Sequence, residues 1–188
     1  FAIETTDRTL DDALKNADMV LGLSSGNIIS QDMVKTMAHD AIIFACANPI
    51  PEITTDRVTS VRPDIIIGTG RSDFPNQVNN VLGFPFIFRG ALDVGAKKIT
   101  ENMKIAAVKA LADLAKEPVP YYVKAIYKDQ TLEFGRRHII PTPFSKEVLV
   151  WVASAVAKAA FDDGVTDMEA CELDKYQDKL RKMIYVDS

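Results

Sequence analysis

Residues 19–70 read MVLGLSSGNIISQDMVKTMAHDAIIFACANPIPEITTDRVTSVRPDIIIGTG, and this stretch decides the fold. It contains three short apolar runs, each followed by a polar segment: Met19–Leu23, Ala41–Cys46 and Asp64–Ile67. The runs begin at 19, 41 and 64, so the spacings of 22 and 23 residues leave room for a helical crossover between neighbouring strands. Continuous apolar runs are typical of strands covered on both faces. The stretch therefore predicts a parallel α/β sheet with flanking helices.

Helix starts are visible between these runs. Thr9 precedes Asp12 by three residues, the spacing of a capping box, and predicts a helix to about Asn16. Ser30 and Thr54 stand at the corresponding places before the second and third runs, and we expect each to cap a helix.

After the sheet the pattern changes to helices. Thr100 begins a segment that ends near Pro118, and four apolar residues are expected on its buried face: Ile105, Val108, Ala112 and Ala115. Further helices are expected over 145–162 and 168–184. Because no Pro/Gly/Ser linker separates two composition regimes, the sequence predicts one domain over 1–188.

Composition excludes several classes of protein. With 188 residues, 47% of them hydrophobic and 26% charged, the chain is typical of a globular protein. A net charge of −4 without a long basic cluster argues against nucleic-acid binding. No apolar stretch reaches the roughly 20 residues that span a bilayer, and the start lacks a signal-peptide pattern. The two cysteines, Cys46 and Cys171, have neither metal-ligand spacing nor the density of a disulfide framework, so we expect a cytoplasmic protein without a membrane partner.

Three polar segments follow the expected strands directly. In an open parallel sheet, ligands bind beyond the carboxyl ends of the strands. The segments are small, amide-rich or glycine-rich, which suits close backbone approach to a flat or phosphorylated ligand. Any one of them alone is typical of a turn, but their coincidence at three strand ends favours a shared site. They are Ser24–Asn27, Asn48–Glu52 and Gly68–Asn80.

Long motifs in this region carry a resemblance to a known family. FACANPIPE (44–52) and GTGRSDFPNQVNNVLGFP (68–85), continuing to FRGALDV (88–94), closely resemble the cofactor-binding domain of bacterial-type malic enzymes. The resemblance extends through ENMKIAA (101–107) and the connector at 139–141 to the C-terminal helices, and so covers nearly the whole chain. It implies part of a Rossmann-like NAD(P)-binding domain, followed by a C-terminal helical extension.

The resemblance also implies an activity. The family oxidises L-malate at C2 with NAD or NADP and decarboxylates the resulting oxaloacetate to pyruvate and CO₂, using Mg²⁺ or Mn²⁺. It therefore implies malate and pyruvate as ligands and a homo-oligomer as the assembly. The cofactor-binding portion of another NAD(P)-dependent dehydrogenase and a non-catalytic nucleotide-binding module stay open as alternatives. The choice between NAD and NADP also stays open.

Individual residues receive roles from this resemblance and from the strand-end rule. Asn48 is expected at the nicotinamide and the substrate, and Asn80 at malate. A neutral amide can orient a carboxylate or a carboxamide without adding a charge that competes with the metal. Ser24, Ser25 and Gly26 are expected to bind the cofactor.

Two further asparagines have two interpretations. Asn76 and Asn79 either contact the ligands or satisfy backbone groups in the turn. Tyr122 and His138 fall outside the strand-end segments, so we interpret them as packing or surface residues.

Several parts of the family's site do not match this chain. The catalytic tyrosine and lysine, the carboxylate metal ligands and the glycine-rich phosphate-binding turn occur upstream of the matching segment. The resemblance thus predicts the C-terminal portion of a longer enzyme, with no catalytic and no metal-binding residue of its own. Such a segment is expected to be inactive alone.

Overall fold

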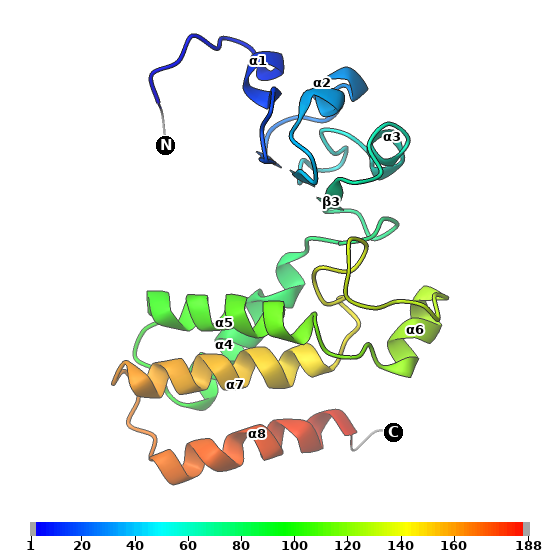
Figure 1. Ribbon diagram of the computed structural model, residues 1–188. Coiled ribbons are helices and arrows are strands. Elements are labelled where there is room, and N and C mark those ends of the chain that lie inside the picture. The colour runs from blue at the N-terminus through cyan, green and yellow to red at the C-terminus, as the bar shows by residue number, and fades with distance from the viewer. Residues whose placement is uncertain (1–2, 186–188) are drawn as a thin grey trace. The chain divides into compact units, whose positions relative to one another are not determined.

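The structure, a computed structural model, describes residues 3–185 (Figure 1). The chain divides into two compact units, Phe1–Val78 and Asn79–Ser188. The first contains all the strands of the described residues, and the second is helical. Within the described residues, none of the helices has both the length and the apolar composition needed to cross a bilayer.

The first unit alternates helices and strands as expected. Its sheet is parallel in the order β1-β2-β3, with Met19 opposite Ile42 and Ile42 opposite Ile66. This pairing confirms the parallel sheet predicted from the apolar runs. The elements in chain order are α1 (Leu10–Leu14), β1 (Met19–Gly22), α2 (Gln31–Thr36), β2 (Ile42–Ala45), α3 (Thr55–Thr59) and β3 (Ile66–Thr69).

The third strand lies two residues later than expected. Asp64 belongs to the preceding turn, because both of its carboxylate oxygens accept hydrogen bonds from Arg62, at 2.8 and 2.7 Å. Pairing with β2 begins at Ile66, and the strand ends with Gly68 and Thr69, which the sequence had assigned to the following loop. The apolar run thus located the strand correctly and its boundaries wrongly.

Two of the three expected helix caps are confirmed. The hydroxyls of Thr9 and Ser30 each accept a hydrogen bond from the backbone N–H three residues on, at 3.1 Å. Thr54 occupies the N-cap position of α3, but its side chain makes no capping hydrogen bond. It bonds to Asp56 instead, and this contact lowers the pKa of the Asp56 carboxyl.

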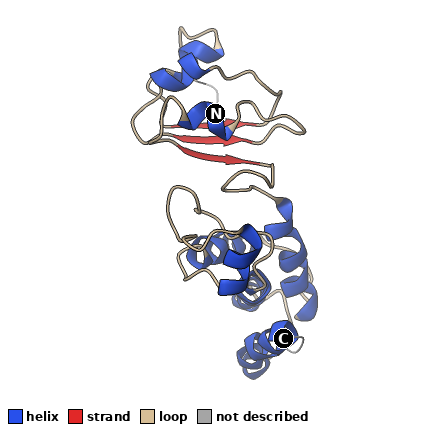
Figure 2. Cartoon of the chain, turned by 90° about the vertical axis from the view of Figure 1, so that its right-hand side faces the viewer, coloured by secondary structure: helices blue, strands red, loops and turns tan. Residues whose placement is uncertain are grey.

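Helices cover one face of the sheet (Figure 2). On the opposite face of β1, Met19 and Leu21 are 49% and 54% exposed. We expected both faces of the sheet to be covered, but within residues 3–185 this face of β1 is exposed. An apolar run indicates a strand, but burial of each face depends on segments that are distant in sequence. The core of the covered face contains Leu14, Ile29, Val34, Met37, Ala41, Ile43, Ala45, Ile53, Val58, Ile65 and Ile67.

The second unit confirms the expected helical extension. Helix α7 packs against α4, α5 and α8, and Figure 1 shows α5 and α8 beside it. Helix α6 had no counterpart among the expected helices. Cys171 lies in α8, and its side chain falls outside what the structure describes. The elements are the 3-10 helix η1 (Asn80–Leu82), α4 (Phe84–Asp93), α5 (Glu101–Leu114), α6 (Tyr121–Tyr127), α7 (Glu147–Asp162) and α8 (Ala170–Tyr185).

The buried face of α5 differs from the expected one. Ile105 and Val108 are 49% and 65% exposed. The buried face of α5 combines two large apolar residues, Met103 and Leu114, with two alanines, and small side chains let two helices approach closely. The face predicted from the spacing of apolar residues was therefore wrong at Ile105, Val108 and Ala112, although Ala115, directly after the helix, is buried as expected. The buried residues within α5 are Met103, Ala107, Ala110 and Leu114.

Close approach also governs the contact between α4 and α7. A Cβ atom on Gly90 would lie 2.5 Å from the backbone oxygen of Ala153 and 2.9 Å from the Cβ atom of Val156. Real Cβ atoms do not approach backbone oxygens so closely. Glycine at this position is thus required by packing, and the position allows no other side chain without a shift of one helix.

We predict that Gly90→Ala lowers the free energy of unfolding by about 1–3 kcal/mol, the usual cost of overpacking. The sign of the change in the free energy of unfolding is informative, because in an open helix interior Gly→Ala stabilises the protein by about 1 kcal/mol. Gly83→Ala is the matched control, since its Cβ would lie 3.7 Å from the nearest atom. Urea unfolding of both variants checks the prediction, and an unchanged or more stable Gly90→Ala protein contradicts it.

Candidate functional site

The loops that follow β1 and β2 lie side by side. The backbone N–H of Asn27 donates to the carbonyl oxygen of Pro51 at 3.0 Å, which links the first loop to the second. A Cβ atom on Gly26 would lie 2.7 Å from the carbonyl oxygen of Ile50. Only a residue without a side chain allows this approach. The expected meeting of the two strand ends is therefore present.

The side chains on these loops are open to ligands. Ser24, Ser25 and Asn48 are exposed, and Gly26 is half-buried. A cis peptide bond joins Asn48 to Pro49. Among residues 3–185 the Asn48 side chain has no hydrogen-bond partner, so both its donor and its acceptor can serve a bound molecule.

Glu52 belongs to this site, although the sequence analysis assigned it no role. Its side chain is fully buried. Oε1 accepts the backbone N–H of Ser24 at 3.1 Å, and Oε2 accepts that of Ala47 at 3.0 Å. The neighbouring sequence does not predict the burial of the Glu52 side chain, because its two backbone donors lie on different loops. Burial and the Glu52 charge together raise the pKa of the Cys46 thiol, as fits an unreactive cysteine.

In the third strand-end segment, Asn76 and Asn79 were expected either to contact ligands or to satisfy backbone groups of the turn. Asn76 is buried, has a positive φ of 55° and donates from Nδ2 to the carbonyl oxygen of Ile67 at 3.0 Å. Asn79 accepts the backbone N–H of Val81 at 3.0 Å and caps η1. Both amides therefore serve the backbone of the turn.

Asn80 differs from these two neighbours. It is the first residue of η1, and its side chain is exposed. No hydrogen-bond partner for this side chain occurs in the described part of the chain. Its amide is therefore available to a ligand.

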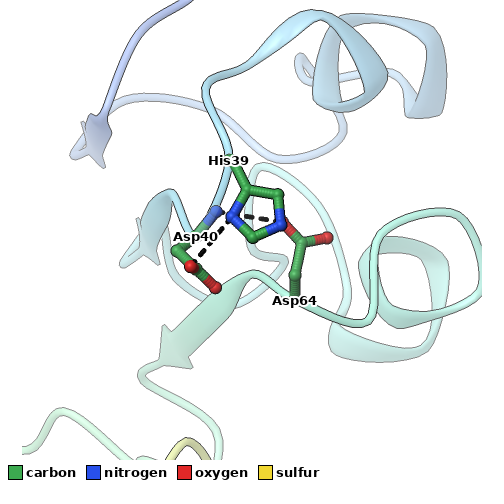
Figure 3. A group of neighbouring side chains, drawn as sticks. All are labelled: His39, Asp40 and Asp64. Atoms are coloured by element: carbon green, nitrogen blue, oxygen red, sulfur yellow. Dashed lines mark hydrogen bonds and ion pairs between the residues drawn. The ribbon is translucent and has the colours of Figure 1, made fainter.

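A cluster of His39, Asp40 and Asp64 brings three possible metal-ligand atoms within 4.8 Å of one another (Figure 3). It lies where the chain enters β2 and β3, whereas the loops after β1 and β2 leave the carboxyl ends of the strands, on the opposite side of the sheet. The Arg62 guanidinium binds both oxygens of Asp64 and holds the pKa of that carboxyl well below its usual range. The cluster is therefore explained as an ion pair that fixes two turns.

Tyr122 and His138 have structural contacts in the second unit. The Tyr122 hydroxyl donates to Glu147 at 2.6 Å and accepts the backbone N–H of Lys146 at 2.7 Å. Burial, aided by the Glu147 carboxylate, raises the pKa of Tyr122 to about 12. His138 is buried beside a cavity of about 210 Å³ that Trp151 also lines, and burial lowers its pKa. The interpretation of both as packing residues agrees with these contacts.

Sequence comparison identifies the family. Residues 3–127 match the family described as "Malic enzyme, NAD binding domain". The chain belongs to the malic enzyme family. It is 56% identical over 165 residues to the NADP-dependent malic enzyme of Halomonas elongata, covering 88% of this chain and 39% of that protein. To the NAD-dependent malic enzyme of Rhizobium meliloti it is 45% identical over 185 residues, covering 98% of this chain and 24% of that protein.

Structural comparison supports the same family. The crystal structure of malic enzyme from Pyrococcus horikoshii superposes with a TM-score of 0.73 and 37% sequence identity. The alignment covers 90% of this chain and 36% of that one. This chain thus spans between 24% and 39% of the length of the malic enzymes compared. The Rossmann-like fold with a helical C-terminal part, expected from the sequence, is confirmed.

Buried His138 makes the stability of the chain depend on pH. Because its folded-state pKa lies below the unfolded value of about 6.5, the unfolded chain binds the proton first. We predict that the free energy of unfolding is fully retained above about pH 7 and falls as the pH drops below 6.5. His138→Gln removes this contribution, while the carboxylates act alike in both proteins. Urea unfolding between pH 5 and 8 measures both slopes, and equal slopes contradict the prediction.

Proposed function

We propose that this chain supplies part of the cofactor and substrate site of an NAD(P)-dependent malic enzyme. The complete enzyme would oxidise L-malate, reduce NAD(P)⁺ and release pyruvate and CO₂. The observation that carries the proposal is the pair of strand-end loops joined by hydrogen bonds, with an exposed Asn48 side chain that has no hydrogen-bond partner among residues 3–185. The chain is also 56% identical to an NADP-dependent malic enzyme.

Each site residue receives a role in this proposal. Asn48 orients the nicotinamide and malate, Ser24, Ser25 and Gly26 bind the cofactor, and Asn80 binds a malate carboxylate. The exposed amides of the two asparagines support this, since neutral amides keep their hydrogen-bonding capacity at every pH at which the enzyme works. When bound, the cofactor would supply the hydride acceptor for C2 of malate, and the residues of this chain would hold both molecules in the reacting geometry.

The metal belongs to another part of the enzyme. Mg²⁺ and Mn²⁺ prefer oxygen ligands. The His39 cluster does not fit such an ion, because its Asp64 is bound by Arg62 and because it lies at the wrong edge of the sheet. We propose that residues outside this chain hold the ion and supply the catalytic acid and base. The two units together would form the C-terminal part of the NAD(P)-binding domain of a cytoplasmic homo-oligomer.

We predict that Asn48→Ala in the full-length enzyme lowers turnover on the order of 100-fold, because small errors in reacting geometry carry costs of this size. Thermal unfolding should not change, since the side chain is exposed. Steady-state kinetics with malate and each cofactor measure the effect. Unchanged kinetics with an intact fold would contradict this role and leave Asn48 as a turn residue only.

Asn80 and Asn79 form a matched pair for the substrate contact. We predict that Asn80→Ala lowers kcat/KM for malate by about 10- to 150-fold, since a hydrogen bond to a charged group contributes roughly 1.5–3 kcal/mol. Cofactor affinity and the melting temperature should change little.

Asn79→Ala should do the opposite. Removal of the cap of η1 should cost about 1 kcal/mol of stability and leave malate use at low temperature intact. Malate kinetics, cofactor titration and thermal unfolding on both variants separate the two roles. Normal malate use by an Asn80→Ala enzyme would exclude the substrate contact.

A further inference from the structure

Glu52 joins the two loops to which the proposed function assigns cofactor and substrate. Its carboxylate bonds Ser24, one of the residues assigned to the cofactor, and Ala47, the residue directly before Asn48. We propose that Glu52 is a positioning residue, whose buried carboxylate fixes the separation of the two loops so that cofactor and malate are held in register. This inference rests on the proposed function of the loops.

The chemistry of the carboxylate fits a bridge between two donors. A carboxylate offers two acceptor oxygens and no hydrogen, so it can receive a backbone N–H on each side. Glutamine, with nearly the same shape, offers one acceptor and turns an NH₂ group toward the other N–H. An apolar side chain would leave both buried N–H groups without a partner. Glu52 is therefore matched to its position by charge state as well as by size.

Gly22 at the end of β1 gives the carboxylate its room. A Cβ atom on Gly22 would lie 2.4 Å from Cδ of Glu52 and 2.5 Å from Oε1, the oxygen that accepts the Ser24 N–H. Any side chain at residue 22 would push this oxygen away from its donor. The end of β1 is thus shaped around the bridge, which is an observation independent of the hydrogen bonds themselves.

The second loop reinforces the same connection from its backbone. The carbonyl oxygen of Glu52 accepts the N–H of Ile29 at 3.1 Å, at the far end of the first loop. Side chain and main chain of one residue therefore hold both ends of the Ser24–Asn27 segment. A loop fixed at both ends has few conformations left, so its serines and glycine are preorganised for a ligand.

Two variants of the full-length enzyme test the bridge, with a third as control. Glu52→Gln removes one acceptor at constant shape. Gly22→Ala displaces the carboxylate and keeps its charge. Gly135→Ala is the control, since a Cβ atom there meets nothing within 4 Å. Each protein is measured for malate and NAD(P)⁺ kinetics, for cofactor binding by fluorescence titration, for thermal unfolding and for amide hydrogen exchange at residues 24 and 47.

Both bridge variants are expected to unfold cooperatively and to exchange the amide of Ser24 or Ala47 faster than the unchanged enzyme. They should lose about tenfold or more in kcat/KM for malate and for cofactor together, with raised KM for both, because both loops move. The control should match the unchanged enzyme. This joint effect differs from that of Asn80→Ala, which should concern malate alone.

Two results would overturn the inference. One is wild-type kinetics and exchange in Glu52→Gln. The other is a fall in kcat at constant KM that matches the unfolded fraction, which is the mark of a residue needed for stability alone. If the unchanged enzyme fails to oxidise malate, the proposed function fails by itself. The cofactor titration then decides on Glu52, since weaker binding in both bridge variants supports the bridge and equal binding refutes it.

Discussion

Parallel pairing of β1, β2 and β3 is the constraint on which the site depends. Because the strands run in one direction, all three carboxyl ends emerge at one edge, and segments more than 20 residues apart in sequence become neighbours. Backbone contact at Gly26 brings the first two loops together, and the Glu52 carboxylate gives them a fixed spacing. The position of Asn48 follows from these contacts.

The second unit depends on a different constraint, the close approach of helices to α7. Gly90 lets the backbones of α4 and α7 lie near one another, and two alanines, Ala107 and Ala110, stand on the buried face of α5. Dispersion contacts among many small groups then stabilise the unit. Ile105 and Val108 lie on the exposed face of α5.

Asparagine side chains show how one residue type takes different roles within five positions. Asn76 fits a left-handed backbone position and closes its turn, and Asn79 caps η1. Asn80 has its amide exposed. The Asn80 amide is the one available to a ligand, because the amides of Asn76 and Asn79 already bond to backbone groups of the turn.

The sequence by itself determined the parallel sheet, the caps at Thr9 and Ser30 and the strand-end loops, because periodicity, capping and turn chemistry act between near neighbours. The family came from the resemblance of its long motifs. Tertiary structure alone decided the burial of Glu52, the division of roles among the asparagines and the buried face of α5. Each of these depends on which distant segment supplies the hydrogen-bond donor or the facing helix. A side chain takes its role from that partner, and the partner is set by the packing of the whole chain.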